Sequence, residues 1–226
     1  MTEITTENVT FGDGGTGFLA SPGGSGPSPA VIVIQEWWGL DAHIKDVAQR
    51  FALEGFIALA PDLYHGKVAD EPSEAQKMMM ALDMNRAARE LIGAAEYLAS
   101  RPGLGGRGIG ATGFCMGGGL ALTLACDNAH VKAVAPFYGV NPSPIDKVAN
   151  ITGPVRAFYA EHDQFAGQSV RERLAEALTK HGKRHEIHVY PGTQHAFFND
   201  TRADAYDKGA ATDAWGRVLA LFRENL

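Results

Sequence analysis

The stretch 113–119, with the sequence GFCMGGG, constrains the fold of this chain more than any other. An apolar run at 108–112 precedes it and a second apolar run at 120–125 follows it, so the pattern predicts a strand, a sharp turn and a helix. The glycines on either side of Cys115 allow a tight turn and hold the cysteine exposed above a sheet. The stretch is therefore typical of a nucleophile elbow, G-x-S-x-G, with cysteine in the serine position.

Cys115 is a candidate nucleophile for acyl transfer. The dipole of the following helix favours the thiolate, which is the form that attacks a carbonyl carbon. Two other interpretations compete with this one. The cysteine could be a small buried apolar residue, with the glycines serving only the packing of the helix. The segment 108–113 also matches the dinucleotide-binding pattern G-x-G-x-x-G, but this match lies inside the predicted strand and no helix begins at Gly113.

The length and composition are those of an ordinary globular protein. With 226 residues and no evident linker, we expect a single domain over 1–226. Hydrophobic residues make up 45% of the chain and charged residues 20%, which is enough for a core of good size. The net charge is −6 and no cluster of lysine and arginine occurs, so nucleic acid and anionic membranes are poor candidate partners.

Three further observations predict a cytoplasmic protein. The first seven residues include the acidic residues Glu3 and Glu7, where a signal peptide would need positive charge followed by an apolar run. No stretch approaches 18 consecutive apolar residues, so we expect no membrane-spanning helix. Cys115 and Cys126 are the only cysteines, and a free reactive thiol fits a reducing compartment.

Strands alternate with helices along most of the chain. An N-terminal hairpin around the turn 12–15 comes first, and a continuous β-branched run at 30–34 is typical of a strand buried on both faces. We expect strands at 4–11, 17–21, 30–34, 56–60, 108–112, 131–138, 155–160 and 185–190, and helices at 41–53, 73–100, 120–125, 170–181 and around 211–222. This order predicts a mostly parallel sheet with helices on both faces and a site beyond the carboxyl ends of the strands.

Candidate partners for Cys115 follow two of the later strands. Asp163 lies after the strand at 155–160, and His195 lies after the strand at 185–190. The order of nucleophile, acid and histidine is the one expected of this topology. We expect His195 to take the thiol proton and later to activate water, while Asp163 orients the imidazole and stabilises its positive charge.

Each of these residues also has another interpretation. Asp163 could cap the helix that follows, and His195 could be a turn residue whose ring is satisfied by the backbone. Glu161 and His162 are rival acid and base, but an acid beyond the end of a strand reaches across more easily than one inside it.

The remaining histidines do not predict a metal site. His185 and His188 are three residues apart in a predicted strand, so their side chains should point to opposite faces. The sequence contains no H-E-x-x-H or C-x-x-C motif, and we expect no metal.

Several motifs together resemble those of the dienelactone hydrolase family of α/β-hydrolases, and the likeness covers nearly the whole chain. They are GFCMGG at 113–118, QEWWG at 35–39, PDLY at 61–64, EHD at 161–163 and GTQHAF at 192–197. The resemblance implies the α/β-hydrolase fold and a carboxymethylenebutenolidase-like enzyme that opens an enol lactone through a cysteine acyl-enzyme. It also implies a monomer without cofactors, with a weak homodimer as the alternative.

The resemblance assigns further roles at the site. It implies an oxyanion hole formed by the backbone N–H groups of Trp37 and Met116, in agreement with one donor after the nucleophile and one after an early strand. Glu36 follows the strand at 30–34 and should emerge at the carboxyl edge, next to the strand that ends at Cys115. In this family a glutamate at this position pairs with the resting thiol. The alternative is a solvated loop carboxylate.

The sequence departs from the family in one place that concerns the substrate. Family members that act on dienelactones hold the substrate carboxylate with an arginine shortly after the histidine, but this chain has Asn199 there. Arg202 is seven residues beyond His195 and is not expected to reach the pocket. We predict substrate contacts from four aromatic residues and Asn199, the aromatic residues being Trp38, Tyr138, Phe165 and Phe198.

The sequence thus predicts a cysteine-dependent hydrolase of carboxylic esters or lactones. One alternative is a binding protein on a hydrolase fold, and another is an esterase for less polar esters that does not act on dienelactone. A thiol-based redox sensor or an acyl transferase is a third possibility. For a sensor, however, Cys126 lies about 16 Å along the same helix from Cys115, which is too far for a disulfide.

Overall fold

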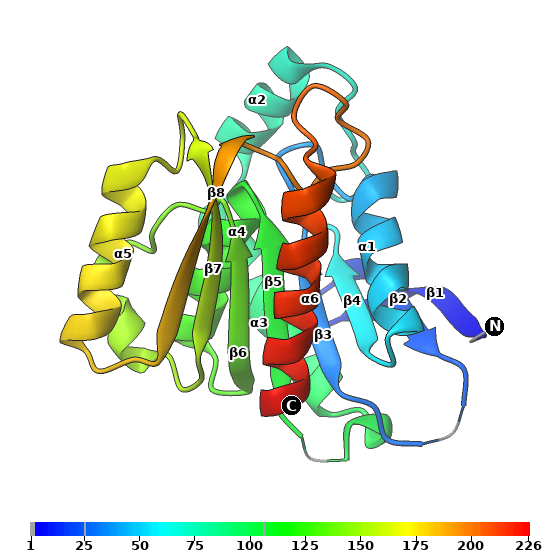
Figure 1. Cartoon of the computed structure of the whole chain (residues 1–226). Coiled ribbons are helices and arrows are strands. Elements are labelled where there is room, and N and C mark those ends of the chain that lie inside the picture. The colour runs from blue at the N-terminus through cyan, green and yellow to red at the C-terminus, as the bar shows by residue number, and fades with distance from the viewer. Residues whose placement is uncertain (1–2, 25, 106) are drawn as a thin grey trace.

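The strands of the described residues form one eight-stranded sheet. The computed structural model describes residues 3–24, 26–105 and 107–226. The strand order is β1-β2-β4-β3-β5-β6-β7-β8 (Figure 1). The strands are β1 Ile4–Phe11, β2 Gly15–Pro22, β3 Ala30–Ile34, β4 Ile57–Pro61, β5 Ile109–Phe114, β6 Val131–Phe137, β7 Val155–His162 and β8 His185–Gln194. The helices are α1 Ala42–Leu53, α2 Pro72–Ala81, α3 Met84–Ala99, α4 Met116–Asp127, α5 Gln168–Lys180 and α6 Lys208–Asn225, with short 3₁₀ helices at Pro102–Leu104 and Ile145–Asn150.

The pairing of the strands confirms the predicted topology. β1 and β2 form the expected antiparallel hairpin, and β2 pairs antiparallel with β4. From β4 to β8 every neighbouring pair is parallel. β3 lies directly beside β5, with Ile34 opposite Gly113, so the segment that follows β3 emerges next to the elbow.

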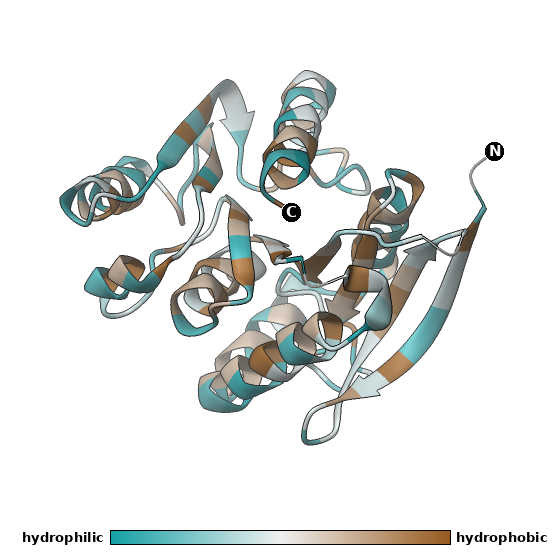
Figure 2. Ribbon diagram, turned by 90° about the horizontal axis from the view of Figure 1, so that it is seen from below, coloured by the Kyte–Doolittle hydropathy of each residue, from teal (hydrophilic) through white to brown (hydrophobic). Residues whose placement is uncertain are grey.

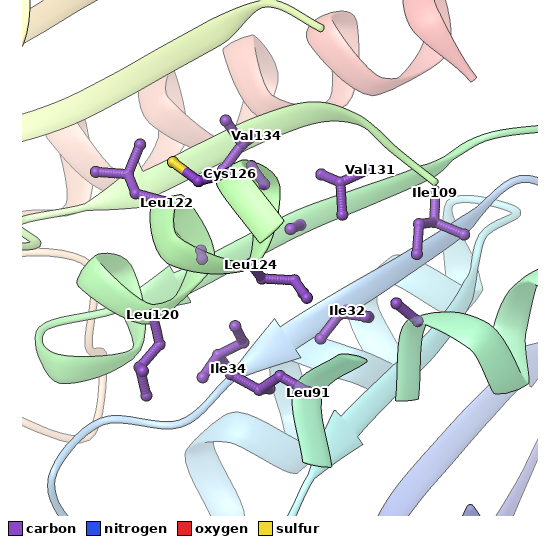
Figure 3. Packing of buried hydrophobic residues seen from close by; sticks show 14 of the residues in the cluster. Ile32, Ile34, Leu91, Ile109, Leu120, Leu122, Leu124, Cys126, Val131 and Val134 are labelled. Atoms are coloured by element: carbon purple, nitrogen blue, oxygen red, sulfur yellow. The ribbon is translucent and has the colours of Figure 1, made fainter. Parts of the chain in front are cut away.

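Helices cover both faces of the sheet, as predicted. A hydrophobic core lies on each face of the sheet, and successive residues of β3 pack alternately into one core and the other, because successive side chains of a strand point to opposite faces. Ile32 and Ile34 pack in the core under α3, α4 and α5, while Val31 and Val33 pack in the core under α1 and α6. Figure 3 shows Ile32 and Ile34 close to side chains of α3 and α4. Figure 2 shows the same layers from below, with apolar residues on the central strands.

The predicted single helix at 73–100 is wrong, because the structure divides it into α2 and α3. Leu82 has an extended backbone, with φ −66° and ψ 120°, and ends α2. The side chain of Asp83 then accepts hydrogen bonds from the backbone N–H groups of Asn85 and Arg86. This cap satisfies two donors that a new helix leaves open, so a second helix begins at this point.

Cys126, the other cysteine, is a core residue of α4. It is buried and lies among the side chains labelled in Figure 3. Burial raises the pKa of its thiol to about 12, which keeps it in the unreactive protonated form.

The turn between β5 and α4 depends on a close approach of backbones. A side chain at Gly117 would collide with the carbonyl oxygens of Ile34 and Gln35, and one at Gly113 would collide with the backbone of Gly117. Neither glycine has a positive φ, so the requirement is for space. The first turn of α4 therefore lies directly against the end of β3 only because these positions lack side chains.

Gly117→Ala should destabilise the protein strongly, whereas Gly216→Ala should not. The methyl group at 117 meets two backbone oxygens that cannot move aside, and overpacking of this kind costs about 1–3 kcal/mol or more. Gly216, inside α6, has no atom within 4 Å of the added methyl group, so alanine there should stabilise by about 0.5–1 kcal/mol. Urea denaturation measures both free energies of unfolding. Equal stability of the two variants would contradict the close approach.

Candidate active site

Three predicted functional residues lie just beyond the carboxyl ends of parallel strands. Cys115 follows β5, Asp163 follows β7 and His195 follows β8. These ends point the same way, toward the top of the molecule in Figure 1, because the strands from β5 through β6 and β7 to β8 all run parallel. The topology therefore brings together residues that are 32 to 80 positions apart in the chain.

Cys115 has a strained backbone, as an elbow requires. Its φ is +56° and its ψ is −116°, a conformation that residues with a side chain rarely adopt. Such strain costs on the order of 1–3 kcal/mol, and here the backbone around it holds it in place. The N–H of Cys115 donates to the carbonyl of Phe137 on β6, and its carbonyl accepts from the N–H of Gly118. The side chain remains partly exposed.

His195 and Asp163 form a direct hydrogen-bonded pair. The distance from His195 Nδ1 to Asp163 Oδ2 is 2.8 Å. The other oxygen, Oδ1, accepts hydrogen bonds from the N–H groups of Phe165 and Ala166, each at 2.8 Å. Burial would raise the pKa of Asp163, but its bonds to His195 and to the two amides outweigh this and lower it. Asp163 does not cap α5, whose N-cap is Gly167, so the helix-cap interpretation is wrong.

The surroundings of His195 favour its protonated form. Burial lowers the pKa of the imidazole, but the hydrogen bond to Asp163 and the contact with Cys115 together raise it to about 10. The Nε2 atom is buried and makes no hydrogen bond of regular geometry within the described ranges. The cysteine sulfur therefore acts on this ring through a looser contact than the one with Asp163.

Glu161 and His162 do not compete for these positions. Both side chains are exposed and lie 3.6 Å apart on the surface. Glu161 Oε2 accepts a hydrogen bond from the N–H of Gly192, in the turn that leads to His195. Glu161 therefore supports the loop that carries the histidine.

Glu36 is buried beside the elbow, with only 2% of its surface exposed, so the alternative of a solvated loop carboxylate is wrong. Its Oε1 accepts from the hydroxyl of Tyr138 at 3.3 Å and its Oε2 from the side-chain amide of Asn199 at 2.9 Å. Burial raises the pKa of this carboxyl group above its ordinary value of 4.5. The hydrogen bonds found for Glu36 thus go to Tyr138 and Asn199, and differ from the pairing with the thiol of Cys115 that the resemblance implied.

Tyr138 connects Glu36 to His195. Its ring is fully buried, its centroid lies 4.8 Å from that of the imidazole, and its hydroxyl reaches Glu36. Its φ of +39° turns the chain sharply at the end of β6. Tyr138 is placed to position these two groups.

The two predicted oxyanion donors lie on either side of the close approach between α4 and β3. Met116 is the first residue of α4, where a helix leaves its N–H without an internal partner. Trp37 follows Glu36 in the turn after β3. In the described part of the chain, neither N–H donates a backbone or side-chain hydrogen bond. Both remain available for an acceptor at the mouth of the site.

Gln35 fixes this turn and was not predicted from the sequence. Its side chain is fully buried, and Oε1 accepts from the N–H of Leu63 at 3.1 Å, joining the turns after β3 and β4. The sequence signals at this position were a glutamine directly after a wholly apolar strand and its place in the QEWWG motif, and neither indicated this contact. Tyr64 was also missed; its hydroxyl lies 3.7 Å from the sulfur of Met116.

The predicted substrate contacts divide into two groups. Trp38 packs edge-on against Trp37 and is partly exposed, and Phe165, which is 66% exposed, lies with its ring 5.1 Å from that of His195. Both can meet a bound molecule. Phe198 and Asn199 are buried, and Phe198 stacks on Phe114 in the core behind the elbow. Phe198 thus takes part in the packing under the site, and Tyr138 is likewise buried, so a contact of either ring with substrate stays a prediction.

Arg202 lies closer to the site than the sequence indicated. Its guanidinium lies 5.7 Å from the ring centroid of Trp38 and makes two hydrogen bonds to Asp204, at 3.0 and 2.7 Å. Its distance in sequence from His195 was misleading, because the loop after β8 turns back over the tryptophan.

Other candidate sites lie elsewhere or have no support. One cavity, of about 100 Å³, lies at the amino ends of β7 and β8, and another, of about 250 Å³, lies between β2 and α1; both are away from Cys115.

Among residues 3–24, 26–105 and 107–226, no group of three or more potential ligands is placed to hold a metal ion. No helix in those ranges is both long and apolar enough to span a bilayer.

Comparison with curated proteins shows similarity along nearly the whole chain. The chain is 38% identical over 245 residues to the Saccharolobus solfataricus protein named "Putative carboxymethylenebutenolidase", covering 91% of this chain and 92% of that protein. It is 37% identical over 217 residues to "Protein usf" of Aquifex pyrophilus, covering 93% of each.

Comparison with solved structures gives the same result. A structure from Klebsiella pneumoniae, titled as a putative dienelactone hydrolase, has a TM-score of 0.89 at 31% identity and covers 98% of this chain and 99% of that one. A dienelactone hydrolase-like promiscuous phosphotriesterase from metagenomic libraries also has a TM-score of 0.89, at 26% identity, and covers 98% of both chains. The model of the dienelactone hydrolase family matches residues 16–226. The chain therefore belongs to the dienelactone hydrolase family and is a hydrolase with the α/β-hydrolase fold.

Proposed function

We propose that this protein hydrolyses carboxylic esters or lactones through a thioester formed on Cys115. The observation that carries the proposal is the hydrogen-bonded pair of His195 and Asp163 next to a cysteine on a strained elbow. A nucleophile, a base in contact with it and an acid that orients the base are the elements of covalent acyl transfer.

In the first half of the reaction, the Cys115 thiol gives its proton to His195 Nε2 and the thiolate attacks the carbonyl carbon of the substrate. The N–H groups of Trp37 and Met116 stabilise the negative charge on the carbonyl oxygen. The intermediate collapses, the bond from carbon to the leaving oxygen breaks, and His195 donates its proton to that oxygen. In a lactone this oxygen stays attached to the acyl chain, so the product is a ring-opened thioester.

In the second half, His195 takes a proton from water and the resulting hydroxide attacks the thioester. The carbon–sulfur bond then breaks, His195 returns the proton to the sulfur, and the carboxylic acid is released. Asp163 keeps its hydrogen bond to Nδ1 and stabilises the imidazolium each time it forms. The raised pKa of His195 favours the state in which the proton has reached the imidazole. Only groups of this chain and water take part.

We propose that Glu36 is a secondary proton acceptor near the resting thiol before substrate binds, while His195 remains the base of the first half. Its carboxyl group is buried with a raised pKa, so it can take up a proton near neutral pH more readily than a surface carboxylate. In this conformation Tyr138 and Asn199 hold it. We propose that substrate binding changes this arrangement and frees the thiolate to turn toward His195.

The site should show little selectivity for an acyl group that carries a carboxylate. The amide of Asn199 is directed at Glu36 and is buried, so position 199 offers the substrate no cation. The proposed mechanism can open enol lactones, as the family membership suggests. Neutral esters and lactones should be accepted equally well.

Cys115→Ala should abolish hydrolysis without unfolding the protein. The replacement removes the nucleophile and leaves a smaller apolar side chain, and loss of a nucleophile that acts together with its base lowers kcat on the order of 10⁴-fold or more. Cys115→Ser should also be poor, because a hydroxyl ionises less readily than a thiol. The burst of product from an activated ester, followed by stopped flow, measures the effect. Turnover near the wild-type rate in the alanine variant would refute the proposal, and the absence of any burst in the wild type would favour a binding protein.

Selectivity for carboxylated substrates should be weak. A charge-assisted contact contributes about 1.5–3 kcal/mol, equivalent to about a tenfold to hundredfold preference, and Asn199 cannot provide it. Values of kcat/KM for matched lactones with and without a carboxylate should therefore agree within about tenfold. A strong preference for the carboxylated lactone would contradict this prediction. Loss of that preference in Arg202→Gln would then assign the contact to the guanidinium over Trp38.

Glu36→Gln should slow acylation and change how stability depends on pH. The amide cannot accept the thiol proton, so the acyl burst should slow and the pH dependence of thiol alkylation should change. Because burial raises the pKa of Glu36, its contribution to stability is present below the ordinary value of 4.5 and is lost as the pH rises through the raised pKa. The variant should therefore gain stability relative to the wild type as pH rises. An identical burst and alkylation profile would leave Glu36 with a structural role only.

A further inference from the structure

Phe165 is an exposed aromatic side chain that packs against the proposed base. It is 66% exposed, and its ring centroid lies 5.1 Å from that of the His195 imidazole, at an interplanar angle of 67°. Scattered apolar side chains on a surface are normal and need no explanation. Phe165 differs from them because it lies against a group at the centre of the site, and its free face can meet a bound molecule.

The backbone of Phe165 is held by the same residue that orients the base. Oδ1 of Asp163 accepts hydrogen bonds from the N–H groups of Phe165 and Ala166, each at 2.8 Å. Oδ2 of Asp163 pairs with Nδ1 of His195 at the same distance. Ala166 is fully buried, and α5 begins just after it. Asp163 therefore fixes the imidazole and the turn that carries Phe165 relative to each other.

The imidazole of His195 has one buried and one exposed aromatic neighbour. The buried neighbour is Tyr138, whose ring centroid lies 4.8 Å away, and the exposed neighbour is Phe165. Within the described ranges, Nε2 of His195 makes no hydrogen bond of regular geometry, so it can serve a bound molecule. Such a molecule reaches the imidazole along the side of the exposed ring, because the buried ring closes the other approach.

The order of the strands separates two sides of the site. The N–H groups proposed as oxyanion donors belong to Trp37, after β3, and to Met116, in the turn of α4 that packs on the end of β3. Phe165 and the proposed base follow β7 and β8, and β6 separates these strands from β5, which leads to Cys115. The sulfur thus lies between the oxyanion donors on one side and the base on the other.

This arrangement assigns the parts of an ester to the two sides. After attack by the thiolate, the carbonyl oxygen must face the donors on the β3 side. The leaving oxygen must reach His195 on the other side, because it receives its proton there. The alcohol part is attached to the leaving oxygen and therefore passes Phe165. The acyl chain takes another direction, since the bonds of the tetrahedral carbon diverge.

We propose that Phe165 is a specificity-determining residue that stacks on the alcohol part of the substrate and favours esters and lactones in which this part is flat and unsaturated. The inference rests on the proposed function, because it follows from the role of His195 as proton donor to the leaving oxygen. Two aromatic rings attract each other, offset or edge-on, beyond the gain from apolar area alone. Phe165 offers a ring for such a pair on a turn that hydrogen bonds hold in place.

The test uses two pairs of esters in which the ring is carried by different halves of the molecule. Benzyl acetate and cyclohexylmethyl acetate carry it on the alcohol, and their isomers methyl phenylacetate and methyl cyclohexylacetate carry it on the acyl group. The ratio of kcat/KM within each pair compares a flat ring with a saturated ring of similar size. Comparing this ratio between variant and wild type removes any difference in intrinsic reactivity.

Phe165→Ala should lower the preference for benzyl over cyclohexylmethyl acetate by about two- to tenfold, as expected for the loss of one aromatic pair. The preference between the two acyl-side esters should not change. Phe165→Leu keeps an apolar side chain without a flat ring. It should lose the same preference, while retaining more of the kcat/KM for cyclohexylmethyl acetate than Phe165→Ala does.

Leu53→Ala is the matched control. Leu53 is also a large exposed apolar residue, with 51% of its surface accessible, but it is the last residue of α1 and precedes the amino end of β4. It therefore lies at the end of the molecule opposite the carboxyl ends of the strands (Figure 1). Its replacement should change neither preference.

The outcomes separate this proposal from the proposed function. An equal loss for all four esters in Phe165→Ala would overturn it, because the ring would then only position the imidazole. A change confined to the acyl-side pair would also overturn it. Hydrolysis without an acyl burst refutes the thioester mechanism and leaves both ratios as valid tests of Phe165.

A wild-type protein that hydrolyses none of the four esters would refute the proposed function. Binding of benzyl alcohol and cyclohexylmethanol, followed by NMR titration, then decides the role of the ring. Tighter binding of benzyl alcohol that is lost in Phe165→Ala would support the pairing, and equal binding of the two alcohols to the wild type would overturn it.

Discussion

The close approach of α4 to the end of β3 is the constraint on which the rest of the site depends. Gly117 touches the backbone of Ile34 and Gln35, and no residue with a side chain can take its place without displacing one of the two segments. This contact places the turn that carries Glu36 beside Cys115 and brings the free N–H groups of Trp37 and Met116 to the same mouth. The side chains proposed to react and the N–H groups proposed as oxyanion donors are thus positioned by backbone packing.

The parts of the fold that the sequence predicted are those set by local patterns. Runs of β-branched residues mark the buried strands, and the order of the strands predicts the parallel sheet. The residues directly after the strands indicate the elbow and the positions of Asp163 and His195. The helix break at Leu82–Asp83 was missed because apolar residues continue across it, and the cap that decides it is a single aspartate. Glu36 contacts Tyr138 and Asn199, which lie 102 and 163 positions away in the chain. No sequence periodicity predicts contacts at such distances, so only the structure could show the burial of Glu36 and its partners.

Glu36 shows what happens to a buried carboxyl group whose hydrogen-bond partners are neutral. A buried carboxylate normally has a cation or several donors nearby, because removing its charge from water is costly. Here the neutral amide of Asn199 and the hydroxyl of Tyr138 are its hydrogen-bond partners, and burial raises its pKa although the bond from Asn199 lowers it. Phe198 belongs to the same region, where aromatic rings pack behind the elbow and limit the water that can reach the carboxyl group.

The central claim is that the acyl group is carried by Cys115, and the most direct measurement is to locate it. The enzyme is mixed with an activated ester, quenched in acid during the burst and digested, and the peptides are analysed by mass spectrometry. The account predicts the acyl mass on the peptide that contains Cys115, absent from Cys115→Ala and released by hydroxylamine as expected of a thioester. An acyl mass on a different residue, or turnover with no acylated peptide at any time during the burst, would contradict it.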